Sequence, residues 1–314
     1  MAFFLVTGGA GFIGSHLVHR LVGEGHRVRV LDNLSEGRRE NLADVMDAIE
    51  FILGDLRDRA VVRRAVTGVE YVLHQAALRS VPRSVADPFA THDVNVTGTL
   101  TLLLAARDAG VRRVVFASSS SVYGSAAELP LRESQMPQPI SPYAASKVAG
   151  EFYCAVFTSL YQVETVCLRY FNVFGPRQDP TSEYAAVIPR FVMAALTGAP
   201  LEIHGDGLQS RDFTYIDNVV EANLLAATTP GIAGEVFNVG GGERYSVLEI
   251  KAHLEEILGT PLAAYHTPAR AGDVRHTQAD LTKAAERLGY RPTISFREGL
   301  RRTVESIRVA LGPR

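Results

Sequence analysis

Short apolar runs alternate with stretches of helical periodicity through the first half of the chain. Because the runs are apolar throughout rather than alternating with polar positions, they are typical of strands in a parallel sheet covered on both faces. The pattern therefore predicts an α/β fold, a Rossmann-type doubly wound parallel sheet. The expected strands are residues 3–6, 27–31, 50–53, 71–75, 113–117 and 165–169. The expected helices are residues 12–22, 59–67, 91–109 and 143–161.

The second half of the chain has a different sequence pattern, in which turn-rich segments separate short helical stretches. We expect residues 1–170 to form a dinucleotide-binding domain, and residues 171–314 to form mainly a smaller α/β domain that binds substrate. We also expect residues 212–239 to return in part to the first domain. The expected helices of this half are residues 188–196, 216–227, 247–258 and 282–288.

Composition narrows the classes of function. The formal net charge of -2 gives no electrostatic reason to expect nucleic acid or an anionic membrane as a partner. The chain has no run of ~18 apolar residues, so no membrane span is predicted. No signal-peptide pattern precedes the first strand, and we therefore expect a cytoplasmic protein. The histidines and the two cysteines, Cys154 and Cys167, lack metal-ligand spacing. We therefore expect no metal site and two buried thiols.

A glycine-rich turn joins the first expected strand to the first expected helix. Gly8, Gly11 and Gly14 give the spacing G-x-x-G-x-x-G, which lets a pyrophosphate approach the backbone at a helix N-terminus. Asp32 ends the second strand, where an acidic residue binds the ribose 2′-hydroxyl and repels a 2′-phosphate. The pattern predicts NAD rather than NADP; an ordinary strand-end turn is the alternative for Asp32.

Two further strand ends border the same expected site. Asp55 follows the third strand and either lies beside the adenine or closes a turn. Small residues within 74–78 follow the fourth strand, where they admit a cofactor or simply serve packing.

Tyr143 and Lys147 lie four residues apart in an expected helix and therefore share a face. A nearby cation favours the phenolate, lowers the tyrosine pKa from its usual value near ~10, and makes the phenol a base near neutral pH. Residues 118–121 are serines at the end of the fifth strand, where ligands bind in open α/β sheets. A serine hydroxyl there could bond to a sugar oxygen; a solvated loop is the alternative. Together with a dinucleotide, this set indicates hydride transfer.

These motifs resemble the extended short-chain dehydrogenases/reductases, and more narrowly the NAD-dependent UDP-glucose and UDP-N-acetylglucosamine 4-epimerases. The resemblance spans essentially the whole chain, and its second half is the more specific. It implies NAD as cofactor, a UDP-sugar as substrate, and a homodimer in which the helices at 91–109 and 143–161 pair across a twofold axis. The segments that carry it are residues 7–14, 31–35, 74–84, 116–124, 141–147, 169–180, 184–190, 205–213 and 270–280.

The resemblance also implies roles for individual residues. Tyr143 is the base, Lys147 tunes it and holds the nicotinamide ribose, and Ser119 is the catalytic hydroxyl, four positions before the tyrosine of V-Y-G. The other implied cofactor contacts are Gly8, Gly11, Phe12, Ile13, Gly14, Asp32, Asn33, Ser35, Asp55, Leu56, Gln75, Ala76, Ala77, Asn95, Ser118 and Tyr170. The implied substrate contacts are Ser80, Ser119, Ser120, Asn172, Val187, Arg190, Gln209, Arg211, Arg270, Asp273 and Thr277.

One departure from related sequences narrows the reaction. The related 4,6-dehydratases place an acidic pair after the catalytic hydroxyl, whereas Ser120 and Ser121 stand here, which argues against dehydration. We expect 4-epimerisation of UDP-glucose and UDP-galactose through a 4-keto intermediate. Thr277 is small where a tyrosine excludes the N-acetyl group in some members, so UDP-N-acetylglucosamine is expected to be accepted too. The alternatives are a UDP-glucuronate 4-epimerase or decarboxylase and, in another class, a non-catalytic dinucleotide sensor, which would need no base.

Overall fold

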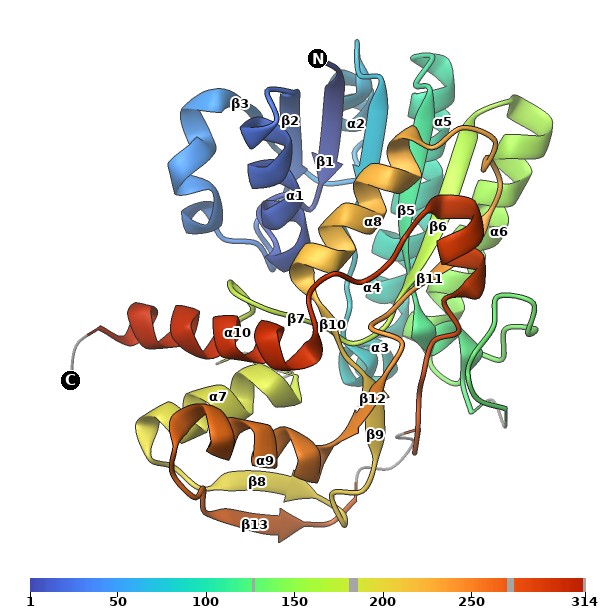
Figure 1. Cartoon of the computed structure of the whole chain (residues 1–314). Helices are drawn as coiled ribbons and strands as arrows, with labels where there is room; N and C mark the ends of the chain where they lie inside the picture. Colours follow the sequence, from blue (N-terminus) through green and yellow to red (C-terminus); the bar gives the residue numbers. More distant parts are fainter. Residues whose placement is uncertain (126–127, 181–185, 270–273, 313–314) are drawn as a thin grey trace.

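A seven-stranded parallel sheet forms the centre of the larger body of the molecule (Figure 1). The computed structural model describes residues 1–125, 128–180, 186–269 and 274–312. The strand order is β11-β6-β5-β4-β1-β2-β3, so the chain winds outward in both directions from β1, and the predicted fold class is confirmed. The strands are β1 (Phe3–Thr7), β2 (Arg27–Asp32), β3 (Ile49–Leu53), β4 (Tyr71–His74), β5 (Arg113–Ser119), β6 (Glu164–Tyr170) and β11 (Val236–Val239).

Helices cover both faces of this sheet, because successive side chains of each strand point to opposite sides. Phe4 and Val6 face a core shared with α1 and α8, whereas Phe3 and Leu5 face a second core shared with α2, α5 and α6. The helices are α1 (Phe12–Gly23), α2 (Arg59–Val66), α3 (Val81–Ala86), α4 (Pro88–His92), α5 (Gly98–Asp108), α6 (Pro142–Tyr161) and α8 (Ile216–Thr228). The other helical segments of this body are η1 (Arg39–Ala48), η2 (Asp93–Thr97) and η3 (Ser120–Tyr123).

The smaller body lies beyond the carboxyl ends of the central strands (Figure 1). Its strands pair as β7 with β10, β9 with β12, and β8 with β13. These strands are β7 (Val173–Phe174), β8 (Leu201–His204), β9 (Ser210–Asp212), β10 (Thr214–Tyr215), β12 (Arg244–Ser246) and β13 (Ala264–Thr267). Its helices are α7 (Val187–Thr197), α9 (Val247–Leu258) and α10 (Phe296–Leu311). The helical turn η4 (Ala284–Leu288) instead packs against β11 and α8 of the larger body.

The chain passes between the two bodies more than once. After β10, helix α8 packs on α1, and β11 then pairs with β6 in the central sheet. Aromatic side chains from both bodies share one core, in which the Tyr245 and Phe296 rings stack with centroids 4.1 Å apart. This shared core fixes the smaller body over the carboxyl edge of the sheet, where ligands bind in open α/β folds.

Helix α10 is absent from the elements expected from sequence. Its buried residues include Phe296, Leu300, Val304 and Ile307, a helical spacing that could have identified it. The two thiols, Cys154 and Cys167, are free and buried, as expected. In the described ranges, no helix combines the length and apolar character needed to cross a membrane.

Candidate active site

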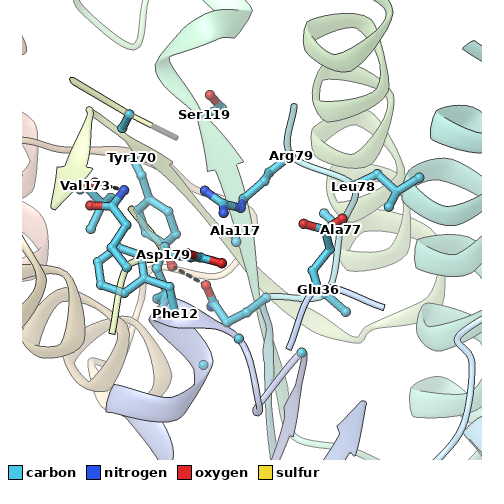
Figure 2. A pocket seen from close by; sticks show the side chains of 18 of the residues that line it. Phe12, Glu36, Ala77, Leu78, Arg79, Ala117, Ser119, Tyr170, Val173 and Asp179 are labelled. Carbon is cyan, nitrogen blue, oxygen red and sulfur yellow. Dashed lines mark hydrogen bonds between the residues drawn. The ribbon is translucent and has the colours of Figure 1, made fainter. Parts of the chain in front are cut away.

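A cavity of about 1020 Å³ runs along the carboxyl edge of the sheet and continues beneath the smaller body. Figure 2 shows a close view of its lining. Most of the residues that the sequence singled out meet there, although they come from many separate segments. Those that line the cavity are Gly8, Gly11, Phe12, Ile13, Gly14, Asp32, Asn33, Ser35, Asp55, Leu56, Gln75, Ala76, Ala77, Ser118, Ser119, Ser120, Tyr143, Lys147, Tyr170, Asn172, Arg211 and Thr277.

The glycine turn closes tightly on itself between β1 and α1. Gly8 has a φ of +68°, and a Cβ added to it would lie 2.8 Å from the backbone of Ala76. Gly11 caps α1 without a side-chain hydrogen bond, so no capping side chain competes for the N–H groups of the first helical turn. These groups and the helix dipole suit an anion, and the residues present fit the pyrophosphate of a dinucleotide.

Asp32 is buried at the end of β2 but keeps its carboxylate on the cavity. Its Oδ2 accepts a hydrogen bond from the Ala10 amide at 2.9 Å, and its Oδ1 accepts one from the Leu34 amide at 2.7 Å. Burial raises the pKa of Asp32, and the two backbone bonds partly offset that rise. Each oxygen retains a lone pair, so the carboxylate can also accept a bond from a ribose hydroxyl.

Asp55 forms a turn and an ion pair while it also lines the cavity. The guanidinium of Arg57 donates to both carboxylate oxygens at 2.9 Å and holds the pKa of Asp55 well below its usual range. The amide of Asn33 donates to Asp55 Oδ2 at 2.9 Å, which fixes Asn33 at the edge of the cavity.

Helix α6 carries Tyr143 and Lys147 in its first two turns. The helix begins there because the Ser141 hydroxyl accepts from the Ala144 amide at 3.1 Å and Pro142 occupies the first turn. Lys147 is 4% exposed, and its Nζ donates to the Ala117 carbonyl at 2.8 Å and lies 5.8 Å from the centroid of the Tyr143 ring. Burial lowers the pKa of Lys147 to about 8.

The pKa of Tyr143 differs from the sequence-based expectation. Burial raises it, while a hydrogen bond with Ser119 and the charge of Arg79 lower it only in part. The prediction that the nearby Lys147 cation lowers the pKa of Tyr143 is therefore wrong for the chain without a bound cofactor. The physical reason is that the phenol loses hydration, while the ammonium group is already engaged with a backbone carbonyl.

Ser119 lies at the end of β5 opposite Tyr170 of β6. Its Oγ accepts hydrogen bonds from the Ser121 amide at 3.2 Å and the Ser121 hydroxyl at 2.9 Å. The neighbouring Ser118 hydroxyl instead donates to the buried carboxylate of Glu151. Of the serine run, Ser119 is thus the hydroxyl that interacts with the phenol of Tyr143.

Two expected site residues support the cavity without lining it. Asn95 is buried, and its side chain bonds to both backbone groups of Leu78 and to the Ser146 hydroxyl. Ser80 caps α3, where its hydroxyl accepts from the Arg83 amide at 3.2 Å. Both residues therefore shape the loop that follows β4.

Three expected substrate contacts lie away from the described cavity lining. Arg190 forms an ion pair with Glu202, because the first turns of α7 face β8. The Gln209 amide donates to the His204 carbonyl at 2.7 Å, and Val187 begins α7 beside the cavity residue Ala186. The remaining two, Arg270 and Asp273, lie outside the described residues.

The cavity also contains residues that the sequence reasoning missed. Arg79, within the 74–84 segment, points into the cavity on the side of Ser119 (Figure 2). Gln178, in the same 169–180 segment as Asn172, also lines it. Within the described residues, Gln178 Oε1 and Thr277 Oγ1 are buried without a hydrogen-bond partner. Unsatisfied polar atoms in a cavity indicate a site for a polar ligand.

The residues of the cavity contain the two halves of a redox site, a dinucleotide cradle and a tyrosine–lysine–serine cluster. Residues 4–240 match the NAD dependent epimerase/dehydratase family, and the chain belongs to this family. No group of three or more His, Cys, Asp or Glu side chains in the described ranges is arranged to hold a metal ion.

Individual relatives resemble the chain along its length. It is 44% identical over 308 residues to a UDP-glucose 4-epimerase of Mycolicibacterium smegmatis, covering 97% of this chain and 98% of that protein. The crystal structure of the Thermotoga maritima UDP-glucose 4-epimerase with UDP-glucose matches with a TM-score of 0.94 and 41% identity, covering 98% and 99% of the two chains. The UDP-N-acetylglucosamine 4-epimerase from Methanobrevibacter ruminantium, in complex with UDP-N-acetylmuramic acid, matches with a TM-score of 0.94 and 39% identity, covering 99% of each chain.

Proposed function

We propose that the chain is an NAD-dependent 4-epimerase of UDP-hexoses that interconverts UDP-glucose and UDP-galactose. The observation that carries the proposal is the meeting of Tyr143, Ser119 and Lys147 with the glycine turn around one cavity. The similarity to UDP-glucose 4-epimerases along nearly the whole chain supports the same reaction.

The described residues suggest how each proton moves. NAD, when bound, supplies a hydride acceptor that later becomes the donor. Tyr143 takes the proton from the sugar 4-hydroxyl, and Ser119 bonds to the same oxygen as the 4-ketone forms. Lys147 stabilises the phenolate through its charge. After the sugar has turned, Tyr143 returns the proton as the second face of C4 is reduced, so atoms and electrons balance over the cycle.

Turning the sugar requires a firm hold on the UDP and a loose hold on the hexose. We propose that Asn172 and Arg211, which line the cavity, contact the UDP, together with Arg270 and Asp273. A guanidinium group matches the oxygens of a diphosphate. Around the sugar, Thr277 leaves room for an N-acetyl group, and we propose that UDP-N-acetylglucosamine is also a substrate.

The serine run favours epimerisation over dehydration. Ser120 and Ser121 follow the catalytic hydroxyl, so no carboxyl group stands there to expel the 6-hydroxyl as water. The charge of Arg79 within the cavity makes UDP-glucuronate the competing substrate that an assay has to include.

A panel of UDP-sugars tests the proposal. The purified chain, with NAD present, is incubated separately with UDP-glucose, UDP-N-acetylglucosamine and UDP-glucuronate, and the products are separated by chromatography. We expect UDP-galactose and UDP-N-acetylgalactosamine from the first two. Conversion of UDP-glucuronate alone, or of none of the three, would refute the proposal.

We further propose that the chain forms a homodimer through α5 and α6. Phe152, Val156 and Leu160 are 64%, 42% and 71% exposed and lie at helical spacing along α6, which gives an apolar face without a cover in the monomer. Leu103 of α5 is buried in the core between α5 and the sheet and does not contribute to this face. Light scattering at micromolar concentration should give twice the 34.1 kDa mass of the chain; a monomeric mass would contradict the proposal.

A further inference from the structure

A buried carboxylate lies directly behind the proposed catalytic residues and joins α6 to β5 and β6. Glu151 is 7% exposed and accepts from Arg169 Nε at 2.9 Å and from Arg169 Nη2 at 2.7 Å. The Ser118 hydroxyl donates a third hydrogen bond to Glu151 Oε1. Because desolvation offsets much of the attraction within a buried ion pair, stability alone does not explain a pair at this position.

Glu151 is connected to both halves of the proposed catalytic cluster. Tyr143, Lys147 and Glu151 follow one another at intervals of four residues, so they lie along one face of α6. Ser118, which Glu151 holds, directly precedes Ser119 at the end of β5. The carboxylate therefore links the helix that carries the base to the strand that carries the catalytic hydroxyl.

We propose that Glu151 is a positioning residue for the reaction: it holds the end of β5 through Ser118 and places a negative charge behind Lys147. This inference rests on the proposed epimerase function. Glu151 itself is not part of the described cavity lining, and it acts through its two neighbours.

The charges around Lys147 support this role. Burial lowers the pKa of Lys147 to about 8, and the charge of Glu151 acts in the opposite direction. His74 stays neutral because burial lowers its pKa to about 3, and burial also keeps the phenol of Tyr143 protonated by raising its pKa. Tyr143 on α6 and His74 on β4 lie near Lys147, and Cys167 and Arg169 on β6 lie near Glu151. One step further out, Tyr123 on η3 contacts Arg169, and Cys154 on α6 contacts Cys167. Of these groups and Glu151, the carboxylate of Glu151 is the one whose negative charge acts on Lys147.

Glu151→Gln keeps the shape of the side chain and removes its charge. Since Lys147 must stay protonated to stabilise the phenolate, we expect the alkaline limb of the kcat profile to move to lower pH by at least about half a unit. The KM for UDP-glucose should change less than twofold, because the proposed UDP contacts lie on other elements. Ser118→Ala should lower kcat without moving the alkaline limb. This variant therefore distinguishes the effect of the Ser118–Glu151 hydrogen bond from the effect of the Glu151 charge.

A second ion pair on the same two strands provides a matched control. Glu164 accepts from Arg113 Nη2 at 2.6 Å at the opposite ends of β5 and β6, far along the strands from the cavity. Glu164→Gln should leave the pH profile unchanged. If Glu151→Gln misfolds because Arg169 is left unpaired, the double variant Glu151→Gln/Arg169→Gln removes that buried charge and should still show the shifted limb.

The lysine content of the chain allows a direct measurement. Lys147, Lys251 and Lys283 are its only lysines, so selective ¹³Cε labelling gives three NMR signals, and Lys147→Arg assigns one of them. We expect the titration midpoint of Lys147 to fall in Glu151→Gln and to stay constant in Glu164→Gln.

The activity profile against pH and the titration of Lys147 together distinguish a failure of the epimerase proposal from a failure of the proposal for Glu151. An inactive wild-type chain with a shifted Lys147 midpoint would overturn the epimerase function and leave the charge effect of Glu151 supported. An active wild-type chain whose pH limb and Lys147 midpoint both stay unchanged in Glu151→Gln would overturn the role of Glu151.

Discussion

Gly14→Ala is the sharpest test of how the glycine turn binds a dinucleotide. Gly14 lies in the first turns of α1, where a Cβ would sit 2.1 Å from the carbonyl oxygen of Gly8 and 2.8 Å from Cα of Gly9. Both neighbours are backbone atoms of the turn itself, so neither can rotate away as a side chain would. The substitution must therefore push the turn away from the helix.

The expected magnitude follows from two opposing effects. Forcing an extra carbon into a packed site costs about 1–3 kcal/mol, and alanine regains about 1 kcal/mol over glycine in a helix. The free energy of unfolding of the cofactor-free chain should thus fall by about 0–2 kcal/mol. Each kcal/mol lost should lower the Tm by roughly 2–4 °C. The larger effect is on binding: stabilisation by NAD, about 2.7 kcal/mol at a hundredfold excess over Kd, should be mostly lost.

The assay measures NAD released from the denatured protein and the Tm with and without added NAD. Gly23→Ala is the control, because Gly23 ends the same helix and an added Cβ would have nothing within 4 Å. This control should retain NAD and gain up to about 1 kcal/mol of stability. A Gly14→Ala protein that carries as much NAD as the wild type would refute the reasoning, and so would equal loss of NAD in both variants.

Further expectations concern the catalytic cluster and the sugar. Tyr143→Phe should lower kcat by about 10²–10⁴-fold with NAD still bound, and Ser119→Ala should cost less; a larger loss in Ser120→Ala than in Ser119→Ala would move the catalytic hydroxyl by one residue. The rate should fall as pH rises through about 8, where Lys147 loses its proton, and a constant rate across that range would contradict this assignment. Thr277→Tyr should suppress turnover of UDP-N-acetylglucosamine while largely sparing UDP-glucose, as measured by chromatography; equal losses on both sugars would place the selectivity elsewhere.

The central sheet could be predicted because each of its strands and helices has a signal within a short stretch of sequence. Each strand is a short apolar run, and each intervening helix has its own periodicity, so the layers follow without knowledge of distant contacts. The smaller body is different, since β8 at 201–204 pairs with β13 at 264–267 and β9 at 210–212 pairs with β12 at 244–246. Such short strands gain their pairing from tertiary contacts, and no pattern within either segment predicts the partner.

The site residues also fall into two groups, those that local motifs predict and those that depend on contacts between distant segments. The glycine turn and the Tyr143–Lys147 spacing are local motifs and come together in the structure as expected. Arg190 was expected to contact substrate, but it pairs with Glu202 across α7 and β8. Gln178 and the end of α10 reach the cavity only because the smaller body folds over the sheet. The spacing of residues along the chain does not predict that contact.

The charge state of the base shows why local spacing is insufficient even where it finds the right residues. One unit of pKa corresponds to about 1.4 kcal/mol between the two protonation states, so a partly buried phenol needs several favourable interactions to ionise near neutral pH. Lys147 lies 5.8 Å from the centroid of the Tyr143 ring and donates to Ala117, while Ser119 and Arg79 lower the pKa only in part. The phenol therefore stays protonated in the chain by itself. A bound nicotinamide would add a positive charge that favours ionisation of Tyr143, so we expect proton removal to depend on occupancy of the cofactor site.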